Sequence, residues 1–188
     1  MSTPSPTVAP AEGRLGVLTV GLGAVASTLI AGVELAKRGL GSPIGSLAQM
    51  DTIRLGKRTD NRNPMIKDFV PLARLEDIVW GAWDPFPDDA YVAATRAGVL
   101  ESGKHLEAIS DTLRAIRPMK AAFERNYVKN IDADNIMGKI SKREMLNAIR
   151  ADINKFRDEK KVDRVVMIWC ASTEIFIEPG PQHQNIES

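Results

Sequence analysis

The fold is decided by LGVLTV (residues 15–20) and by GLGAVAST (residues 21–28), which follows it directly. The first is a short apolar run rich in β-forming residues, which is typical of a parallel strand covered on both faces. Gly21 and Gly23 interrupt this run. Residues 26–38 then place apolar side chains at steps of three and four, as a helix packed on one side does. The sequence therefore predicts a strand, a glycine turn and a helix.

The glycine turn has the form G-x-G-x-x-A, with Ala26 in the last position. In this motif the first glycine allows a tight turn, the second lets the backbone approach a pyrophosphate, and the small third residue lets the helix pack on the strand. The helix N-terminus then presents N–H groups and a partial positive charge to the phosphates. A glycine pair after a strand can also be a simple tight turn. The motif and its context favour dinucleotide binding.

Composition restricts the class of protein. The chain has 188 residues, of which 44% are hydrophobic and 26% charged, which fits one soluble globular domain. A net charge of +1 argues against nucleic-acid or membrane partners. One cysteine excludes an intrachain disulfide framework and fits a reducing compartment. Residues 1–12 lack the segments of a signal peptide, so we expect a disordered tail there and a cytoplasmic protein.

Further elements follow the first helix in alternation. Strands are predicted at residues 44–50, 75–83 and 162–169, and helices at residues 89–97, 104–117 and 142–159. Asp88 is the predicted cap of the first of these helices, and Ser141 and Glu144 form a capping box for the last. This order predicts an α/β fold with a Rossmann-like, doubly wound, mostly parallel sheet.

Candidate binding residues follow the predicted strands, where ligands of such sheets lie. Asp84 could accept hydrogen bonds from a ribose diol, or it could be an aspartate of a turn or cap. Cys170 begins a run of small residues at the end of the strand at 162–169. No suitably placed base supports a nucleophile there, so we expect Cys170 to be an inert packing residue. His105 has no second ligand at metal spacing, so no metal site is predicted.

A basic run at residues 54–62 contains Arg54, Lys57, Arg58 and Arg62. We expect a solvated loop there. The alternative is a loop that faces phosphate, such as the 2′-phosphate of NADP. A carboxylate at Asp84 would repel that phosphate, which favours NAD as the cofactor.

Four blocks resemble the amino-terminal part of the inositol-3-phosphate synthase family, also called the myo-inositol-1-phosphate synthases, in its bacterial form. They are GLGAVAST (21–28), GSLAQMDTIRLG (45–56), DIVWGAWD (77–84) and KVDRVVMIWCASTE (161–174). The resemblance implies an NAD-binding domain over residues 13–178, followed by a connection or tail over residues 179–188. It also implies that this sheet is incomplete, because family members are about twice as long or more. Their catalytic lysines and aspartates, tetramerisation sheet and last nucleotide-domain elements lie beyond this stretch.

The resemblance implies an NAD-dependent isomerase of inositol and phospholipid biosynthesis. In the family, bound NAD oxidises D-glucose 6-phosphate at C5. Enolisation and an intramolecular aldol cyclisation follow, and NADH reduces the inosose to give 1D-myo-inositol 3-phosphate. Full-length members are homotetramers. We expect this chain to be inactive alone, with its catalytic residues unknown.

The resemblance also assigns the cofactor contacts. The turn would hold the pyrophosphate, Asp84 the adenine-side ribose, and the segments at Ala121 and at residues 170–173 the nicotinamide side. The family often has Ser or Gly at Ala121, and Cys170 and Ser172 replace its common Thr and Asn. The candidate cofactor-binding residues are Gly21, Gly23, Ala24, Val25, Ala26, Ser27, Asp84, Ala121, Cys170, Ala171, Ser172 and Thr173.

Two other functions remain open from the sequence. One is a generic NAD-binding module of an oxidoreductase. The other is a non-catalytic chain that self-associates, because a sheet without its later strands exposes an edge and an apolar face.

Overall fold

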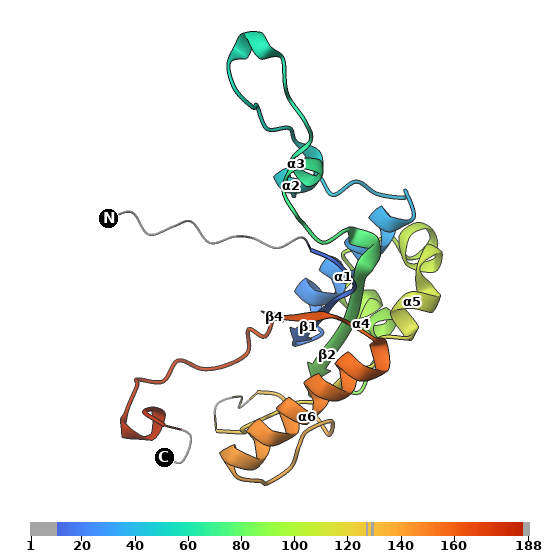
Figure 1. Cartoon of the computed structure of the whole chain (residues 1–188). Helices are drawn as coiled ribbons and strands as arrows, with labels where there is room; N and C mark the ends of the chain where they lie inside the picture. Colours follow the sequence, from blue (N-terminus) through green and yellow to red (C-terminus); the bar gives the residue numbers. More distant parts are fainter. Residues whose placement is uncertain (1–10, 127, 129, 186–188) are drawn as a thin grey trace, which may run out of the picture.

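The computed structural model describes residues 11–126, 128 and 130–185. The predicted tail at residues 1–12 therefore lies almost wholly outside the described residues, as do residues 186–188 of the predicted connection. Four parallel strands form one sheet in the order β3-β2-β1-β4. They are β1 (Leu15–Val20), β2 (Ile78–Asp84), β3 (Met119–Lys120) and β4 (Arg164–Trp169). Because each strand runs the same way, all carboxyl ends meet at one edge of the sheet (Figure 1).

Helices cover both faces of this sheet. On one face lie α1 (Ala24–Lys37), α4 (Ala90–Ala97) and α5 (Ser110–Arg114), and on the other lies α6 (Lys142–Lys160). The chain moves outward from β1 to β2 and β3, and then returns past β1 to form β4 on its other side. This reversal confirms the predicted doubly wound α/β fold. It also places a crevice between the ends of β1 and β4, where such sheets bind ligands.

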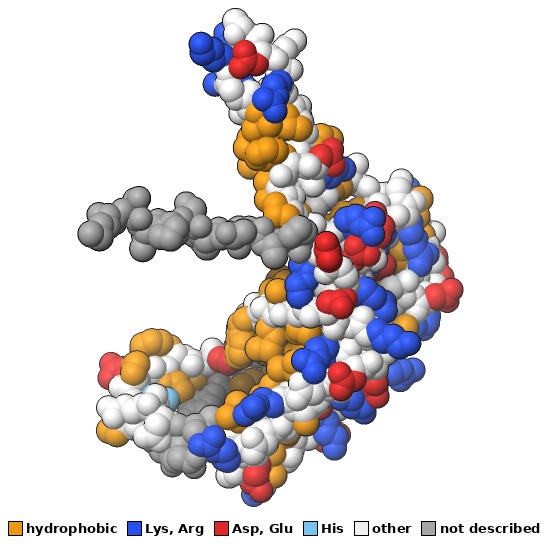
Figure 2. All heavy atoms as spheres, in the orientation of Figure 1, with side chains coloured by type: hydrophobic (Ala, Val, Ile, Leu, Met, Phe, Trp, Pro, Cys, Tyr) orange, Lys and Arg blue, Asp and Glu red, His pale blue; other side chains and the backbone are white. Residues whose placement is uncertain are grey.

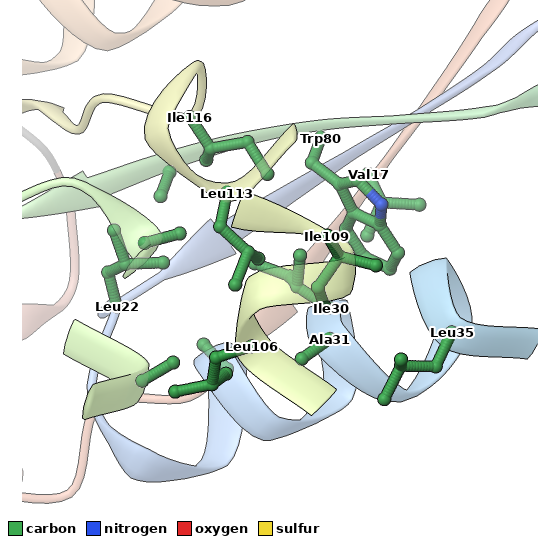
Figure 3. Close-up of a cluster of buried hydrophobic side chains, with 14 residues drawn as sticks. Val17, Leu22, Ile30, Ala31, Leu35, Trp80, Leu106, Ile109, Leu113 and Ile116 are labelled. Carbon is green, nitrogen blue, oxygen red and sulfur yellow. The ribbon is translucent and has the colours of Figure 1, made fainter. Parts of the chain in front are cut away.

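The larger core lies between the sheet and the helices α1, α4 and α5 (Figure 3). Ile30 of α1 and Leu113 of α5 are fully buried there, beside Trp80 of β2. The indole Nε1 of Trp80 donates to Glu34 Oε1 at 2.8 Å, and Lys37 Nζ donates to the same oxygen at 2.6 Å. These bonds satisfy a carboxylate that burial would otherwise destabilise.

The second core lies between the sheet and α6, and it contains Leu18, Trp83 and Phe156. The predicted capping box at the start of α6 is confirmed. Glu144 N donates to Ser141 Oγ at 3.2 Å, and Ser141 N donates to Glu144 Oε2 at 2.8 Å. The donated bonds from Ser141 lower the pKa of the Glu144 carboxyl.

Several predicted elements were wrong in extent or type. The predicted strand at residues 44–50 is instead a loop with the short helix α2 (Leu47–Met50). The single helix expected at residues 104–117 is divided into a π-helical turn, η3 (Ser102–Leu106), and α5. The cap of α4 is Asp89, whose carboxylate accepts the N–H groups of Tyr91 and Val92, and not Asp88. A 3₁₀ turn, η2 (Leu75–Asp77), precedes β2.

Residues 44–70 form a projecting arm that leaves the body of the molecule (Figure 1). Its two legs are held together by backbone bonds, such as Ile53 N to Pro64 O and Leu55 N to Arg62 O, each of 2.9 Å. The arm also carries η1 (Arg58–Asp60) near its tip and α3 (Ile66–Phe69) near its base. Every residue of the arm is at least partly exposed.

β4 is one of the two edge strands, and its apolar side chains are exposed on both faces. Met167 is 54% exposed and Trp169 is 67% exposed. Figure 2 shows hydrophobic side chains gathered on the hollowed side of the body, over β4. After β4 the described chain has no helix or strand until η4 (Pro181–His183). Within the described residues, none of the helices is both long and apolar enough to span a membrane.

Candidate cofactor-binding cleft

Two adjoining cavities lie at the carboxyl ends of β1, β2 and β4. The α4-side cavity measures about 310 Å³ and is lined by the glycine turn, Asp84 and side chains of α4. The α6-side cavity measures about 200 Å³ and is lined by Trp83, Ile149 and Met167, among others. The two share five lining residues, which are Gly21, Pro85, Ile131, Ala171 and Thr173. Together they form one elongated cleft across the edge of the sheet.

Gly21 begins the turn at the centre of this cleft. Its N–H donates to Trp83 O at 2.8 Å, which ties the turn to β2. Its φ is +94°, a conformation that side chains rarely adopt. A Cβ at this position would lie 3.1 Å from the backbone nitrogen of Ala171. Glycine is therefore required both by the backbone angle and by the segment that follows β4.

Gly23 is the N-cap of α1 and faces open space. A Cβ there would have no neighbour within 4 Å. No side chain caps the helix, and its first turn has no acidic residue. The N-terminus of α1 thus presents N–H groups and a partial positive charge to the α4-side cavity, as a pyrophosphate requires. Ala26 is fully buried, which is the close helix packing that the motif predicts.

Asp84 joins the end of β2 to the glycine turn. Its Oδ2 accepts the N–H of Leu22 at 2.6 Å, and its Oδ1 accepts the N–H of Phe86 at 2.9 Å. The second bond closes a local turn. A turn is one of the two roles that the sequence allowed for Asp84. A carboxylate has about four acceptor positions, so Asp84 can hold both N–H groups and still accept a ribose hydroxyl from the α4-side cavity.

Cys170 lies where β4 enters the cleft. Its N–H donates to Val20 O at 2.8 Å, and its side chain packs against the larger core. Burial raises the pKa of its thiol, which disfavours the reactive thiolate. His183 lines neither cavity, and its Nδ1 accepts the N–H of Gly180 at 2.8 Å. This geometry agrees with Cys170 as a packing residue.

The cleft brings together most of the predicted site residues. The α4-side cavity is lined by Gly21, Gly23, Ala24, Asp84, Cys170, Ala171, Ser172 and Thr173, and the α6-side cavity by Ala121. Val25 is exposed, and Ala26 and Ser27 are buried. None of these three lines either cavity.

Sequence reasoning missed the cleft residues that follow Asp84. Phe86, Asp88, Ala93 and Arg96 all line the α4-side cavity. One signal could have found them. A helix was predicted directly after Asp84, and a helix that follows a strand end begins at the edge of the sheet, where the cleft lies. The basic run at residues 54–62 lies on the arm and lines neither cavity, which supports a solvated loop.

The α6-side cavity is mainly apolar. Among the described residues, Glu174 is the one ionisable residue that lines it, in a wall that includes Phe123, Val128 and Trp169. Across the described residues, no three or more His, Cys, Asp or Glu side chains form a group that could hold a metal ion. The cleft thus offers a phosphate cradle and a carboxylate at one end, and an apolar wall at the other.

Comparisons with known proteins agree with this architecture. The family model for the NAD-binding domain of myo-inositol-1-phosphate synthase matches residues 15–188. Inositol-3-phosphate synthase 1 of Bacteroides thetaiotaomicron is 45% identical over 180 residues, which cover 95% of this chain and 41% of that protein. The enzyme of Trypanosoma brucei brucei is 30% identical over 181 residues, covering 88% of this chain and 34% of that protein.

A solved structure shows the same fold. The crystal structure of inositol-3-phosphate synthase from Caenorhabditis elegans superposes with a TM-score of 0.77 at 26% identity, covering 90% of this chain and 36% of that one. The chain therefore spans about two fifths or less of the length of the relatives described. The match over residues 15–188 shows that the chain belongs to the myo-inositol-1-phosphate synthase family and contains its NAD-binding domain.

Proposed function

We propose that this chain supplies the NAD-binding part of an inositol-3-phosphate synthase, the isomerase that converts D-glucose 6-phosphate to 1D-myo-inositol 3-phosphate. The observation that carries the proposal is the open N-terminus of α1 at Gly23, which faces a cavity flanked by Asp84. When bound, NAD supplies the hydride acceptor and donor of an isomerisation without net redox change.

The proposal gives a role to each group of residues in the cleft. The N-terminus of α1, where Gly23 and Ala24 line the α4-side cavity, holds the pyrophosphate through backbone N–H groups. Asp84 binds the adenine-side ribose while it positions Leu22 and Phe86. Ala121 and the segment at residues 170–173 lie along the nicotinamide side. This arrangement is supported by the way the two cavities meet at Gly21, Ala171 and Thr173.

We further propose that the chain alone does not catalyse the isomerisation. Enolisation and aldol cyclisation need positioned acid–base groups and a group that stabilises an enolate. Within the part of the chain that the structure describes, Glu174 is the one ionisable residue that lines the α6-side cavity. The described residues of this cavity thus lack the required set.

The proposal is tested by calorimetric titration of the full chain with NAD. Asp84→Ala is expected to weaken binding by about tenfold or more, because it removes an acceptor and releases the Leu22 N–H. Asp152→Ala is the matched control, since Asp152 accepts the Trp83 indole N–H at 2.9 Å but lines neither cavity. A folded chain that binds no NAD would contradict the proposal.

The second part of the proposal is tested by an assay for turnover of D-glucose 6-phosphate in the presence of NAD. No turnover is expected from the purified chain. Measurable formation of the inositol phosphate would show that the acid–base groups are present after all.

Cytoplasmic location and homotetrameric assembly of the full-length enzyme are part of the same proposal and rest on the resemblance. The exposed apolar side chains of β4 favour one alternative, self-association of this chain without nucleotide binding. Light scattering over a range of concentrations separates the two. Self-association that NAD does not alter, in a chain that binds no NAD, would support the alternative.

A further inference from the structure

Beyond Asp84, the α4-side cavity contains a charged pair, Arg96 and Asp88. Arg96, in the last turn of α4, places Nη2 2.6 Å from Asp88 Oδ2. Its guanidinium carbon lies 6.0 Å from the centre of the Phe86 ring. The N–H of Phe86 in turn donates to Asp84 Oδ1 at 2.9 Å. One residue thus connects the arginine to the carboxylate at the end of β2, and all four residues line the same cavity.

Asp84 and Arg96 favour different groups on the adenine-side ribose. In sheets of this type, a carboxylate after the second strand accepts the ribose 2′-hydroxyl of NAD, whereas a nearby arginine accommodates the 2′-phosphate of NADP. This cavity contains both kinds of group. The cations of the arm do not line it, so Arg96 is the arginine available for a 2′-phosphate there.

Asp88 is the ion-pair partner of this arginine. Its carboxylate accepts a hydrogen bond from Nη2 of the guanidinium that a 2′-phosphate would need. The two carboxylates, Asp84 and Asp88, with this one guanidinium leave a net charge of −1 at this end. A 2′-phosphate that approached the Arg96 guanidinium would be repelled by the Asp88 carboxylate, which is already bonded to it. Discrimination of this kind rests on an element that rejects the wrong ligand rather than on one that attracts the right ligand.

We infer that Asp88, by pairing with Arg96, is a specificity-determining residue that makes the cleft select NAD over NADP. The inference rests on the proposed function, since it requires the adenine-side ribose to lie at Asp84. It gives a role to Asp88 and Arg96, which belong neither to the glycine motif nor to the end of β2.

The test compares NAD and NADP in calorimetric titrations of the full chain. Asp88→Asn keeps the shape of the side chain and removes its charge, and it should raise the affinity for NADP by about tenfold or more while the affinity for NAD changes by less than about threefold. The Asp88 side chain is 31% exposed, so we expect the variant to fold, and circular dichroism checks this.

Two further variants make the result decisive. Asp77→Asn breaks the comparable surface pair Arg74–Asp77, of 2.9 Å, which lies outside the cleft, and should leave both affinities unchanged. The double variant Asp88→Asn/Arg96→Gln should lose the gain in NADP affinity.

Each outcome separates the inference from the proposal beneath it. An unchanged ratio of affinities in Asp88→Asn, or a gain that survives in the double variant, would overturn the inference and leave NAD binding intact. A wild-type chain that binds neither nucleotide would overturn the proposed function and the inference with it.

Discussion

Two regions of this chain have features that bind phosphate in other proteins, but they differ in whether they line the cleft. The glycine turn at residues 21–28 has no cationic side chain, whereas the basic run at residues 54–62 has four. The turn opens onto the α4-side cavity at the edge of the sheet. The basic run lies on the arm and lines neither cavity of the cleft. The local number of cations is therefore a poor guide to where a phosphate binds here.

The difference has a physical origin. The turn uses backbone N–H groups whose direction is fixed by α1 and by two anchoring bonds, Gly21 N to Trp83 O and Leu22 N to Asp84 Oδ2. Donors that are fixed in advance lose little entropy when a ligand binds. The cations of the arm are flexible side chains on exposed backbone, where water screens their charge. Cofactor binding should therefore depend on the turn and not on the arm.

The largest effect is expected from Gly23→Asp. An aspartate at the N-cap would accept the N–H groups that the pyrophosphate needs, and its charge would repel the phosphates. NAD affinity should fall by at least about a hundredfold. The same carboxylate should stabilise α1 by about 0.5 kcal/mol. Calorimetry and urea denaturation measure these opposite changes.

Gly32→Ala in the middle of α1 is the matched control for this variant. A Cβ there also meets no atom within 4 Å, so the variant should gain about 0.5–1 kcal/mol of stability and bind NAD normally. Unchanged NAD affinity in Gly23→Asp would remove the turn as the phosphate site.

Gly21→Ala should combine a loss of binding with a loss of stability. An alanine would be strained at this positive φ, and its Cβ would press on the backbone of Ala171. We expect the unfolding free energy to fall by about 1–3 kcal/mol. We expect NAD affinity to fall by about tenfold or more, since the turn shifts. Gly98→Ala, at φ +64° with no neighbour within 4 Å, should be destabilised by about 1 kcal/mol. Weakened NAD binding in this control would show that strain alone explains the effect.

A smaller effect is expected on the reactivity of Cys170, which is the one cysteine of the chain and lines the α4-side cavity. Because burial raises the pKa of its thiol, less thiolate is present at pH 8 in the folded chain than in the unfolded chain. Alkylation should be slower in the folded chain, and saturating NAD should slow it by a further several-fold. A rate that equals that of the chain in urea would contradict this placement.

The smallest effect is expected on the arm. Replacement of Arg54, Lys57, Arg58 and Arg62 by Gln should change NAD affinity by less than about twofold at physiological salt. These side chains lie outside the cleft and contribute only a distant, screened charge. A loss of tenfold or more in calorimetry would revive the basic run as a phosphate-binding loop.

Local signals in the sequence predicted the parts of the structure that local geometry decides. The capping box at Ser141 and Glu144 and the turn at Gly21 depend on residues that are neighbours in the chain, and both are present. Within the helix predicted at residues 104–117, the apolar positions at steps of three and four are buried, although the helix is interrupted; they are Leu106, Ile109, Leu113 and Ile116. Periodicity identifies a buried face more readily than it identifies the exact backbone path.

Tertiary contacts decided the parts that sequence reasoning missed. The apolar residues at 44–50 resemble a strand, yet the arm offers no sheet for them to join, and Ile44 is 82% exposed. β3 has two residues, too few for any periodic pattern. Arg96 lies on α4, which packs against α1. The sequence indicated that this helix begins at the edge of the sheet, but it did not predict the contact between the two helices.

The most direct test of the account is a backbone NMR titration of the full chain with NAD, because it reports the turn and the arm in one experiment. We predict shifts at the amides of Gly21, Gly23 and Ala24 and at residues 170–173, with no shifts at residues 51–66 of the arm. Shifts confined to the arm, or a glycine turn that saturating NAD leaves unchanged, would contradict the placement of the cofactor at the carboxyl edge of the sheet.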